Sequence, residues 1–534
     1  MAGMRIGFSA IAVVMALVVQ PAGRAAFQGP ARGATTPAID AAFKQFWDAR
    51  TPEEASGATA AVVGSGIGFD EAYARLKGGR AYSPQAQRGV VRLNRRAGQT
   101  DFGYTLDVPQ TYDPSRTYQV RIQLHGGVTG RQDGTTAGRG GVPGIGALAG
   151  AEQIYVLPLA WNDAPWWSRT QVENLRAILD SVKRTYNVDE NHVVLSGVSD
   201  GGTAAYYVAM HDTTPFASFL PLNGAILVLT NDSLGIAADL LPNNLLNKPW
   251  FVVNGWKDQL YPPGLVEPYV EHLQRSGVDV TYRPQPEGAH NTAWWPEVRD
   301  GYETFVREHP RAPYPAKLTW ETDAIDTSTR AHWLVIDALN PQDKREPLPD
   351  VNRFVPPPLA GFGLRADGTK IISVLADSSA STFDLKPGDV VAAVNGRAIP
   401  EGQRLLQFLE TVPGNNFITM TVVRGDQRVE VRGYFAPGVS TPRRMFGRAA
   451  PTGRVDLVRD GNTVQATTRG VAAFTLLLSP DVFDFTKPVK VVADGRTVFD
   501  GLVKKSLETA MKWAARDNDR TMLFGAEISV KLAP

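Results

Sequence analysis

Residues 187–202 read NVDENHVVLSGVSDGG and hold the pattern glycine-x-serine-x-glycine around Ser199. An apolar, strand-like run precedes this pattern and a helix-like run follows it. At such a strand-to-helix turn, one hydroxyl is pushed out at the carboxyl edge of a sheet. Gly197 and Gly201 are expected there because larger side chains would collide across so tight a turn. The stretch therefore predicts a nucleophilic serine. The alternative is a glycine-rich structural turn with an idle hydroxyl.

Strand-like and helix-like segments alternate on both sides of this turn. One helix-like stretch carries an apolar face formed by Val172, Leu175, Ile178, Leu179 and Val182. Strands that alternate with helices imply a parallel sheet with helices on both faces, so the predicted fold class is α/β. The strand candidates are residues 118–124, 154–159, 193–195, 219–222, 250–253 and 278–282.

The composition limits the remaining functions. With 534 residues the chain is long enough for two to four domains, and 43% hydrophobic with 20% charged residues is typical of globular proteins. A formal net charge of +1 gives no reason to expect nucleic acid or an anionic membrane as a partner. The absence of cysteine excludes disulfides and thiolate sites, and no two of the 7 histidines have the helical zinc spacing. We therefore expect no metal.

The amino terminus has the features of a secretion signal. Arg5 supplies positive charge, residues 6–19 are apolar, and residues 23–25 read GRA, a small-x-small cleavage site. The apolar run is shorter than the roughly 20 residues of a membrane-spanning helix. We expect a cleaved signal peptide and a secreted or periplasmic protein, with an uncleaved anchor as the alternative.

Residues 187–202 also resemble the α/β-hydrolase superfamily and are most similar to secreted esterases of the polyhydroxybutyrate-depolymerase and feruloyl-esterase type. The resemblance spans about residues 102–309. It implies a catalytic triad in the chain order serine, acid, histidine, which works without a metal or organic cofactor.

Asp258 is the acid that this chain order predicts. The acid should follow the next-but-one strand after the turn, and the apolar run at 250–253 is that strand. Asp258 lies on the loop just beyond it, where a carboxylate would hold the imidazole in the correct tautomer. A solvated loop aspartate is the alternative interpretation. Glu267 is the fallback, although it falls within the following helix-like stretch.

His290 is the expected general base. It follows the strand candidate at 278–282 through a short glycine-containing loop. The other downstream histidines are less suitable, because His272 lies in a helical run, His309 ends the domain and His332 lies in a later strand. His290 would take the proton of the serine and return it to the leaving group.

Two backbone donors are expected to stabilise the developing negative charge. One is the amide of Asp200, directly after the serine. The other is the amide of Gly126 or Gly127, at the end of the strand candidate 118–124, and both remain candidates because the fuller glycine run of related esterases is absent. His125 is expected to order this loop.

Tryptophans cluster in sequence around these loops. They could form a flat wall for an aromatic acyl group, a sugar or a polymer, or they could be core residues. The substrate-binding candidates are Trp166, Trp167, Trp256, Trp294 and Trp295.

A second resemblance lies further along the chain. Residues 385–396 read LKPGDVVAAVNG, and with Phe362-Gly363-Leu364 they resemble a PDZ domain over about residues 356–434. The resemblance implies that backbone amides at Phe362, Gly363 and Leu364 receive the terminal carboxylate of a peptide, which would extend a sheet edge. The alternative is a blocked groove that serves only as a spacer.

Changes of pattern divide the chain. The pieces 313–350 and 450–534 both have strand-like alternation, and we expect them to form one β-sandwich interrupted by the PDZ-like domain, since the shorter piece cannot bury a core alone. The predicted division is signal peptide 1–25, linker 26–38, N-terminal helical segment 39–95, α/β-hydrolase domain 96–312, first β part 313–350, PDZ-like domain 351–436, linker 437–449 and second β part 450–534.

These features predict a secreted serine hydrolase of carboxylic esters. A serine peptidase of the same fold is the runner-up, because it would share the triad. A non-catalytic secreted protein that binds peptides is the alternative from another class. The expected partners are an ester or peptide substrate and a peptide or protein C-terminus at the PDZ-like domain.

Overall fold

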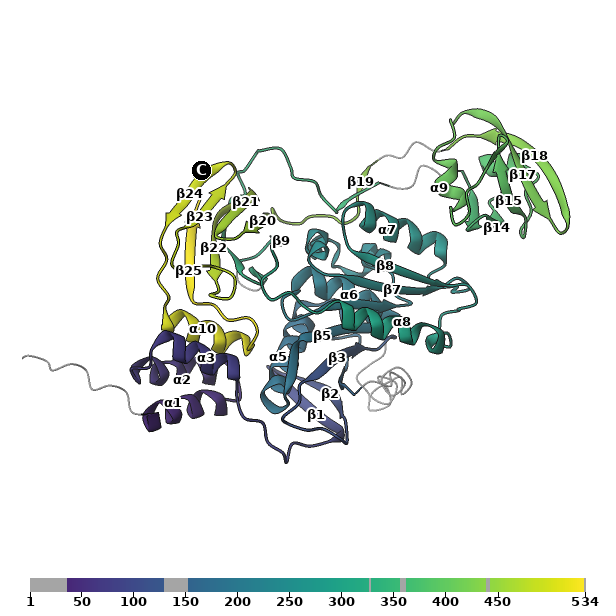
Figure 1. Cartoon of the computed structure of the whole chain (residues 1–534). Helices are drawn as coiled ribbons and strands as arrows, with labels where there is room; N and C mark the ends of the chain where they lie inside the picture. Colours follow the sequence, from purple (N-terminus) through teal and green to yellow (C-terminus); the bar gives the residue numbers. More distant parts are fainter. Residues whose placement is uncertain (1–35, 129–151, 326–327, 356–361, 438–441, 533–534) are drawn as a thin grey trace, which may run out of the picture.

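The computed structural model describes residues 36–128, 152–325, 328–355, 362–437 and 442–532. Within these residues the chain forms a central sheet with its helices, an N-terminal group of helices, a C-terminal pair of sheets and a small separate sheet (Figure 1). The predicted signal peptide and most of the predicted linker 26–38 lie outside the described residues. A search of the described part of the chain finds no helix with the length and apolar character needed to cross a membrane.

The central sheet consists of β1 Gly89–Ala97, β2 Thr100–Val108, β3 Tyr118–Leu124, β4 Ile154–Pro158, β5 Val188–Val198, β6 Ser218–Leu222, β7 Trp250–Gly255 and β8 Val280–Gln285. Its strand order is β1-β2-β4-β3-β5-β6-β7-β8. Neighbours from β4 to β8 in this order run parallel, whereas β2 pairs antiparallel with both β1 and β4. The predicted α/β class is confirmed, and the sheet is mixed rather than wholly parallel.

Helices cover both faces of the central sheet. Alternate residues of β5 belong to two different apolar cores, with Val193 and Leu195 in one and Val194 in the other. This separation follows because successive side chains of a strand point to opposite faces. The covering helices are α5 Arg169–Thr185, α6 Asp200–His211 and α7 Pro263–Arg275 on the first core and α8 Trp295–Glu308 on the second.

Strand β1 begins within the stretch 39–95 that the sequence predicted to be helical, and it crosses the predicted boundary. Most of its residues are exposed or only half-buried, and Val90 is 67% exposed. A strand with so little burial lacks the apolar alternation that marks a half-buried strand in sequence. The predicted boundary at 95/96 is therefore corrected, since the central sheet already begins at Gly89.

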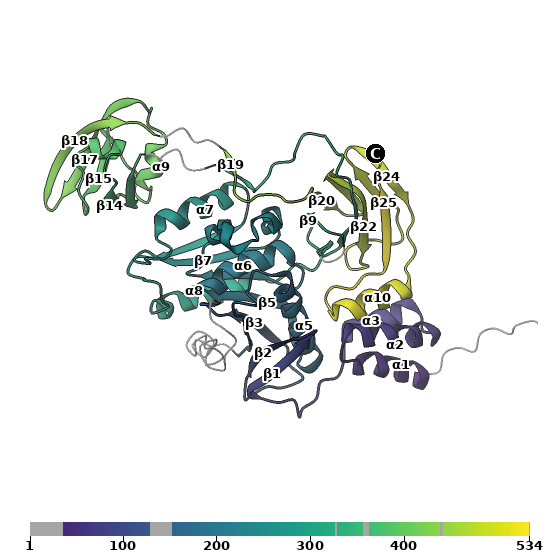
Figure 2. The ribbon, with the colours of Figure 1, turned by 180° about the vertical axis from the view of Figure 1, so that it is seen from behind.

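The N-terminal helices pack on a helix from the far end of the chain. They share one apolar core with α10, and α2 and α3 both contact α10 (Figures 1 and 2). Phe43, Phe46 and Leu76 are buried in this core together with Met511. The helices are α1 Thr36–Asp48, α2 Pro52–Gly64, α3 Phe69–Gly78 and α10 Leu507–Asp517.

The C-terminal sheets draw strands from both predicted β parts. The strands are β9 Lys317–Thr322, β10 Arg330–Ala331, β11 Leu334–Leu339, β20 Gly453–Asp460, β21 Thr463–Arg469, β22 Val471–Leu478, β23 Val489–Ala493, β24 Arg496–Gly501 and β25 Ala526–Lys531. One sheet has the order β10-β11-β22-β25 and the other β24-β23-β21-β20-β9. Both contribute to one core, in which Trp320 and Trp333 are buried.

The small sheet has the order β13-β14-β15-β17-β18, with β16 beside β15, and it has a core of its own. The chain enters and leaves this region through the paired strands β12 Arg353–Phe354 and β19 Arg443–Arg444. The remaining elements are β13 Leu364–Asp367, β14 Lys370–Val374, β15 Val390–Val394, β16 Arg397–Ala398, α9 Leu405–Leu409, β17 Asn416–Arg424 and β18 Gln427–Phe435.

Candidate functional site

Ser199 occupies a strained turn between β5 and α6. Its backbone has φ 56° and ψ −118°, a region that costs a non-glycine residue about 1–3 kcal/mol and is found most often at functional sites. The flanking glycines leave no space for a side chain. A methyl at Gly197 would lie 2.1 Å from the carbonyl oxygen of Gly201, and one at Gly201 would lie 2.3 Å from that of Leu124. The turn therefore requires these glycines, and it presents the Ser199 hydroxyl at the end of β5.

The structure brings together the three side chains predicted to act with one another. Oγ of Ser199 lies 2.9 Å from Nε2 of His290, and Nδ1 of His290 lies 2.7 Å from Oδ2 of Asp258. With a proton on Nδ1, His290 donates to the carboxylate, and its Nε2 accepts the hydrogen bond of the serine hydroxyl. This arrangement can remove a proton from Ser199 and stabilise the resulting imidazolium.

Asp258 is fixed by its surroundings at the end of β7. Its side chain is fully buried, and Oδ1 accepts hydrogen bonds from the backbone amides of Leu260 at 2.8 Å and Tyr261 at 2.9 Å. Three donors thus converge on one buried carboxylate, which limits its rotation. Glu267, the fallback acid, lies on α7 and faces Arg404 instead.

Two of the predicted oxyanion donors, Asp200 and Gly126, lie beside Ser199. Asp200 begins α6, so its backbone amide belongs to the first turn, where helices leave amides without an intrahelical partner. Gly126 lies against the serine, since a methyl there would be 2.8 Å from the Cβ of Ser199. Gly127 follows with φ 69°, a conformation that favours glycine. The amide of Val128 donates to Oδ2 of Asp200 at 3.0 Å, which ties this loop to the start of α6.

His125 holds the same loop from behind. Its Nδ1 lies 2.8 Å from the carbonyl oxygen of Gly126, and its Nε2 accepts a hydrogen bond from the amide of Ala160 at 3.0 Å. The indole of Trp166 donates to the backbone carbonyl of His125 at 2.8 Å. Burial lowers the pKa of His125, so the ring stays neutral, as this pair of contacts requires. These contacts agree with the loop-ordering role expected for His125.

The predicted tryptophan wall needs correction. Trp166, Trp167, Trp294 and Trp295 are buried in the two cores of the central domain. Only Trp256 is half-buried and reaches the surface. Proximity in sequence to the site loops misled the prediction, because large apolar rings beside a strand end gain more free energy from core burial than from exposure.

The three residues predicted to receive a peptide terminus lie at the start of the small sheet. Phe362 is fully buried, with its ring against those of Phe383 and Phe435, and Leu364 begins the edge strand β13. Gly363 has φ 80°, and a methyl there would lie 2.2 Å from the Cβ of Ser378. The side chains of Phe362 and Leu364 therefore anchor this segment, and any ligand contact must come from its backbone.

Two further residues contact the site and were not foreseen. Tyr261 packs its ring edge-on against His290, with ring centroids 5.3 Å apart. Asn223, at φ 46°, donates from Nδ2 to the carbonyl oxygen of Asn291 at 2.7 Å and accepts from the amide of Gly255 at 3.2 Å. Asn223 thus joins the end of β7 to the loop that carries His290. The position of Tyr261 three residues after Asp258 was the one available signal.

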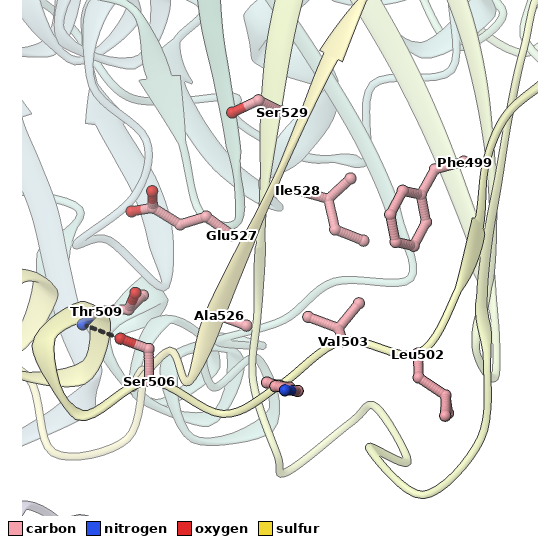
Figure 3. Close-up of a pocket in the computed structure, with 10 residues that line it drawn as sticks. Phe499, Leu502, Val503, Ser506, Thr509, Ala526, Glu527, Ile528 and Ser529 are labelled. Carbon is pink, nitrogen blue, oxygen red and sulfur yellow. Dashed lines mark hydrogen bonds between the residues drawn. The ribbon is translucent and has the colours of Figure 1, made fainter. Parts of the chain in front are cut away.

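Two further features of the described residues bear on a second site, a possible metal cluster and a hollow. Among the described residues, no group of histidine and carboxylate side chains is arranged to hold a metal ion. A hollow of about 430 Å³ between β25 and the segment after β24 is lined by Phe499, Val503 and Ile528, among others (Figure 3). Its Ser506 accepts a hydrogen bond from the amide of Thr509 and so caps α10. None of the predicted site residues lines this hollow.

No family model matches the chain. The chain is similar to a probable feruloyl esterase C of Aspergillus terreus, with 26% identity over 149 residues. This match includes 27% of the chain and 52% of the relative, so the chain spans about half the length of the curated relative that it matches.

Several solved structures are also similar to part of the chain. S-formylglutathione hydrolase from Staphylococcus aureus is 18% identical, with 42% of this chain and 98% of that chain covered and a TM-score of 0.33. Esterase 2 of Thermogutta terrifontis is 15% identical, with 42% and 96% covered and a TM-score of 0.34. The strand order of the central sheet and the turn at Ser199 show an α/β sheet with a serine on a sharp strand-to-helix turn at its carboxyl edge.

Proposed function

We propose that this chain is a serine hydrolase that cleaves carboxylic esters through an acyl-enzyme. The observation that carries the proposal is the continuous hydrogen-bonded series from Asp258 through His290 to Ser199, with distances of 2.7 and 2.9 Å. A serine alone is a weak nucleophile, and this series supplies the base and the orienting carboxylate that activate it. The similarity to a probable feruloyl esterase over half its length supports an ester as the substrate.

Acylation begins when Nε2 of His290 takes the proton of Ser199. Oγ then attacks the ester carbonyl carbon, and the electron pair of the C=O bond moves to the carbonyl oxygen. The amide of Asp200, with that of Gly126 or Gly127, would donate to this oxygen. The tetrahedral intermediate collapses, the bond to the alcohol breaks, and the imidazolium returns its proton to the departing alcohol.

Deacylation repeats these steps with water. His290 takes a proton from the water, whose oxygen attacks the acyl carbon. Collapse of the second intermediate releases the carboxylic acid, and the proton passes from the imidazolium to Oγ of Ser199. Asp258 accepts the hydrogen bond of Nδ1 of His290 and stabilises the imidazolium in both half-reactions. All of these steps use side chains and backbone amides, so the proposal needs no cofactor.

Labelling with a fluorophosphonate tests the nucleophile, because only an activated serine forms the covalent adduct. The adduct should be found on Ser199 by mass spectrometry, and the Ser199→Ala variant should remain unlabelled. A panel of chromogenic esters of graded chain length, feruloyl esters and peptide amides should then show turnover of the esters. Turnover of the amides alone would identify a peptidase, and an unlabelled wild-type protein would refute the proposed hydrolase.

We also propose that the region 351–436 is a PDZ-like module that binds a peptide C-terminus. Support comes from Gly363 at positive φ between two anchored side chains, directly before β13, which ends the sheet order. A peptide could add to this edge strand through backbone hydrogen bonds. Fluorescence polarisation with a library of carboxy-terminal peptides should detect binding, and amidation of the same peptides should abolish it.

For the remaining parts we propose a β-sandwich formed by 313–350 with 450–534, and secretion or periplasmic export. The shared core and the pairing of β11 with β22 and of β9 with β20 support the sandwich. Export rests on the sequence of residues 1–25 alone. Mass spectrometry of the protein from its native host should find a mature amino terminus near residue 26.

A further inference from the structure

A cavity of about 580 Å³ lies where the N-terminal helices, the central sheet with its helices and the C-terminal region meet (Figures 1 and 2). Its walls come from the start of α2, strand β1, helix α5, strand β10 and the end of α10. Ligand sites in proteins commonly enclose about 300–1,000 Å³, so this cavity has room for a small molecule. None of the triad residues lines it, and it is therefore separate from the proposed esterase site.

The charged side chains that line the cavity are mostly basic. Eight arginine and lysine side chains are present, against six aspartates and glutamates. An excess of one charge between low-dielectric walls concentrates the electric field and attracts ions of the opposite sign. The lining thus favours an anion.

The aspartates of the lining already have cationic partners. Asp517 accepts two hydrogen bonds from Arg330, at 2.6 and 2.7 Å. Asp519 lies 2.8 Å from Arg311 and 3.8 Å from Lys183, so two cations share one carboxylate. The remaining aspartates also pair with arginines, Asp180 with Arg184 and Asp212 with Arg176. These carboxylates are therefore not available to neutralise the other arginines of the cavity.

Three arginines of the lining have no ion-pair partner among the residues that the structure describes: Arg50, Arg95 and Arg516. They come from the segment between α1 and α2, from β1 and from α10. Arg95 donates one hydrogen bond, to Oδ1 of Asn174 at 3.2 Å. A guanidinium has five N–H donors, so these three side chains can supply many more hydrogen bonds.

The two glutamates of the lining do not replace a ligand. Glu53 and Glu173 are exposed, and neither forms an ion pair within the described ranges of the chain. Charges in contact with solvent are screened by salt, so their effect on the enclosed arginines is weak.

Trp513 holds two guanidinium groups of the cavity close together. Arg330 lies over its ring at 4.3 Å from the centroid, and Arg516 at 5.2 Å. Burial lowers the pKa of Arg516, and the charge of Arg330 lowers that pKa further. Like charges held this close repel each other, and a bound anion would offset the repulsion.

We propose that this cavity binds a small oxyanion with two or more negative charges, held by Arg50, Arg95 and Arg516. Guanidinium groups bind phosphate and carboxylate oxygens through paired hydrogen bonds, which gives both geometry and affinity. A ligand that engages all three arginines would join three regions of the chain. Its binding should therefore raise the melting temperature.

Isothermal titration of the purified protein with pyrophosphate and with citrate, at constant ionic strength, tests the site. The two anions distinguish a phosphate ligand from a carboxylate ligand. We expect saturable one-to-one binding of at least one of them. The variants Arg516→Gln and Arg95→Gln should each weaken it about tenfold, the lower range for a hydrogen bond between charged groups. Arg50→Gln should act in the same direction, and it provides a third variant if another one fails to fold.

Two controls remove the same charge from the same elements. Lys512 lies over the ring of Trp513 at 5.0 Å, but it pairs with Glu527 at 2.8 Å and does not line the cavity. Arg92 is exposed on β1 and also lies outside the lining. Lys512→Gln and Arg92→Gln should bind the anion with the affinity of the wild type.

Three results would overturn the proposal. The first is the absence of saturable binding of either anion at millimolar concentration. The second is binding that survives the combined replacement of the three arginines by glutamine. The third is an equal loss of affinity in the control variants, because the loss would then follow the net charge of the protein rather than the cavity. Labelling of Ser199 by a fluorophosphonate is a separate measurement, so none of these results bears on the proposed hydrolase.

Discussion

The central sheet and the two C-terminal sheets are assembled from the chain in different ways. All strands of the central sheet come from one stretch, residues 89–285. Each C-terminal sheet instead combines strands from residues 317–339 with strands from residues 453–531. The central sheet is therefore formed by segments that follow one another in the chain. The C-terminal sheets are formed by two segments between which the small sheet is inserted.

This difference has a consequence for chemistry. Parallel neighbouring strands end at the same edge, so the ends of β5 and β7 and the loop after β8 bring Ser199, Asp258 and His290 to one place. In the C-terminal region, polar side chains hold the regions together, as Arg520 between α10 and β25 does with Glu190 of β5 at 2.7 Å. We expect substitutions at the edge of the central sheet to affect turnover, and substitutions in the C-terminal region to affect stability.

Replacing the nucleophile should give the largest effect. Ser199→Ala removes Oγ, and kcat for an aryl ester should fall on the order of a million-fold, as for other triad serines. Circular dichroism and thermal unfolding should match the wild type, because alanine fits wherever serine does at this turn. Unchanged turnover would show that Ser199 is not the nucleophile. It would also contradict the expectation that substitutions at the edge of the central sheet affect turnover.

Replacing the acid should give the second largest effect. Asp258→Asn keeps the shape of the side chain but no longer favours the proton on Nδ1 of His290, so kcat should fall about ten thousand-fold. The matched control is Glu267→Gln, a change of the same chemistry in the carboxylate that we kept as the fallback. A larger loss in the control than in Asp258→Asn, measured with the same aryl ester, would transfer the role to Glu267.

The sequence could predict the site residues that follow strand ends. Ser199, Asp258 and His290 each follow an apolar run, directly or through a short loop, and the topology of a parallel sheet makes such positions neighbours. The contact of Tyr261 with Asp258 and His290 depends on the turn at 258–261, whose backbone amides fold back onto the carboxylate. No apolar pattern records such a turn, so side-chain contacts of this kind could not be predicted.

Exposure, burial and distance along the chain explain the other differences between prediction and structure. Strand β1 was assigned to the helical segment because its side chains are largely in solvent and carry no periodic signal. The four buried tryptophans lie next to site loops in sequence, but pack into the cores below them. The partnership of α1, α2 and α3 with α10 could not be foreseen either, since the partners come from opposite ends of the chain.

Breaking a buried ion pair of the C-terminal region should lower the free energy of unfolding without changing kcat. The side chains of Arg311 and Asp519 are only 1% and 3% exposed and lie 2.8 Å apart. Breaking such a buried pair costs about 3 kcal/mol or more. Asp519→Asn should lower the free energy of unfolding by this amount at pH 7, and kcat should remain close to that of the wild type. The control Asp48→Asn removes an exposed partner of Lys44 and should change stability little.

The effect of Asp519→Asn should depend on pH. Burial alone would raise the pKa of Asp519, but Arg311 and Lys183 hold that pKa well below its ordinary value. A carboxyl with a depressed pKa contributes stability above its unfolded-state value, and this contribution is lost as the pH falls toward the folded-state value. The difference between variant and wild type in urea unfolding should therefore shrink below about pH 4. A constant difference down to pH 2 would contradict the assigned shift.

Removing the small sheet should have the smallest effect. It tests whether the two C-terminal segments stay paired without the small sheet between them. Phe354 and Arg443 are directly paired, so replacing residues 355–442 with Asn-Gly would close β12 and β19 into a two-residue hairpin. The deletion would remove the ion pair of Arg404 with Glu271, which spans 2.8 Å, is partly exposed and is worth about 1 kcal/mol or less. We expect the melting temperature and kcat to stay near those of the full chain, because β9 and β11 keep their partners. Collapse of stability in this variant would show that the small sheet holds the two C-terminal segments together, and that their pairing is not sufficient by itself.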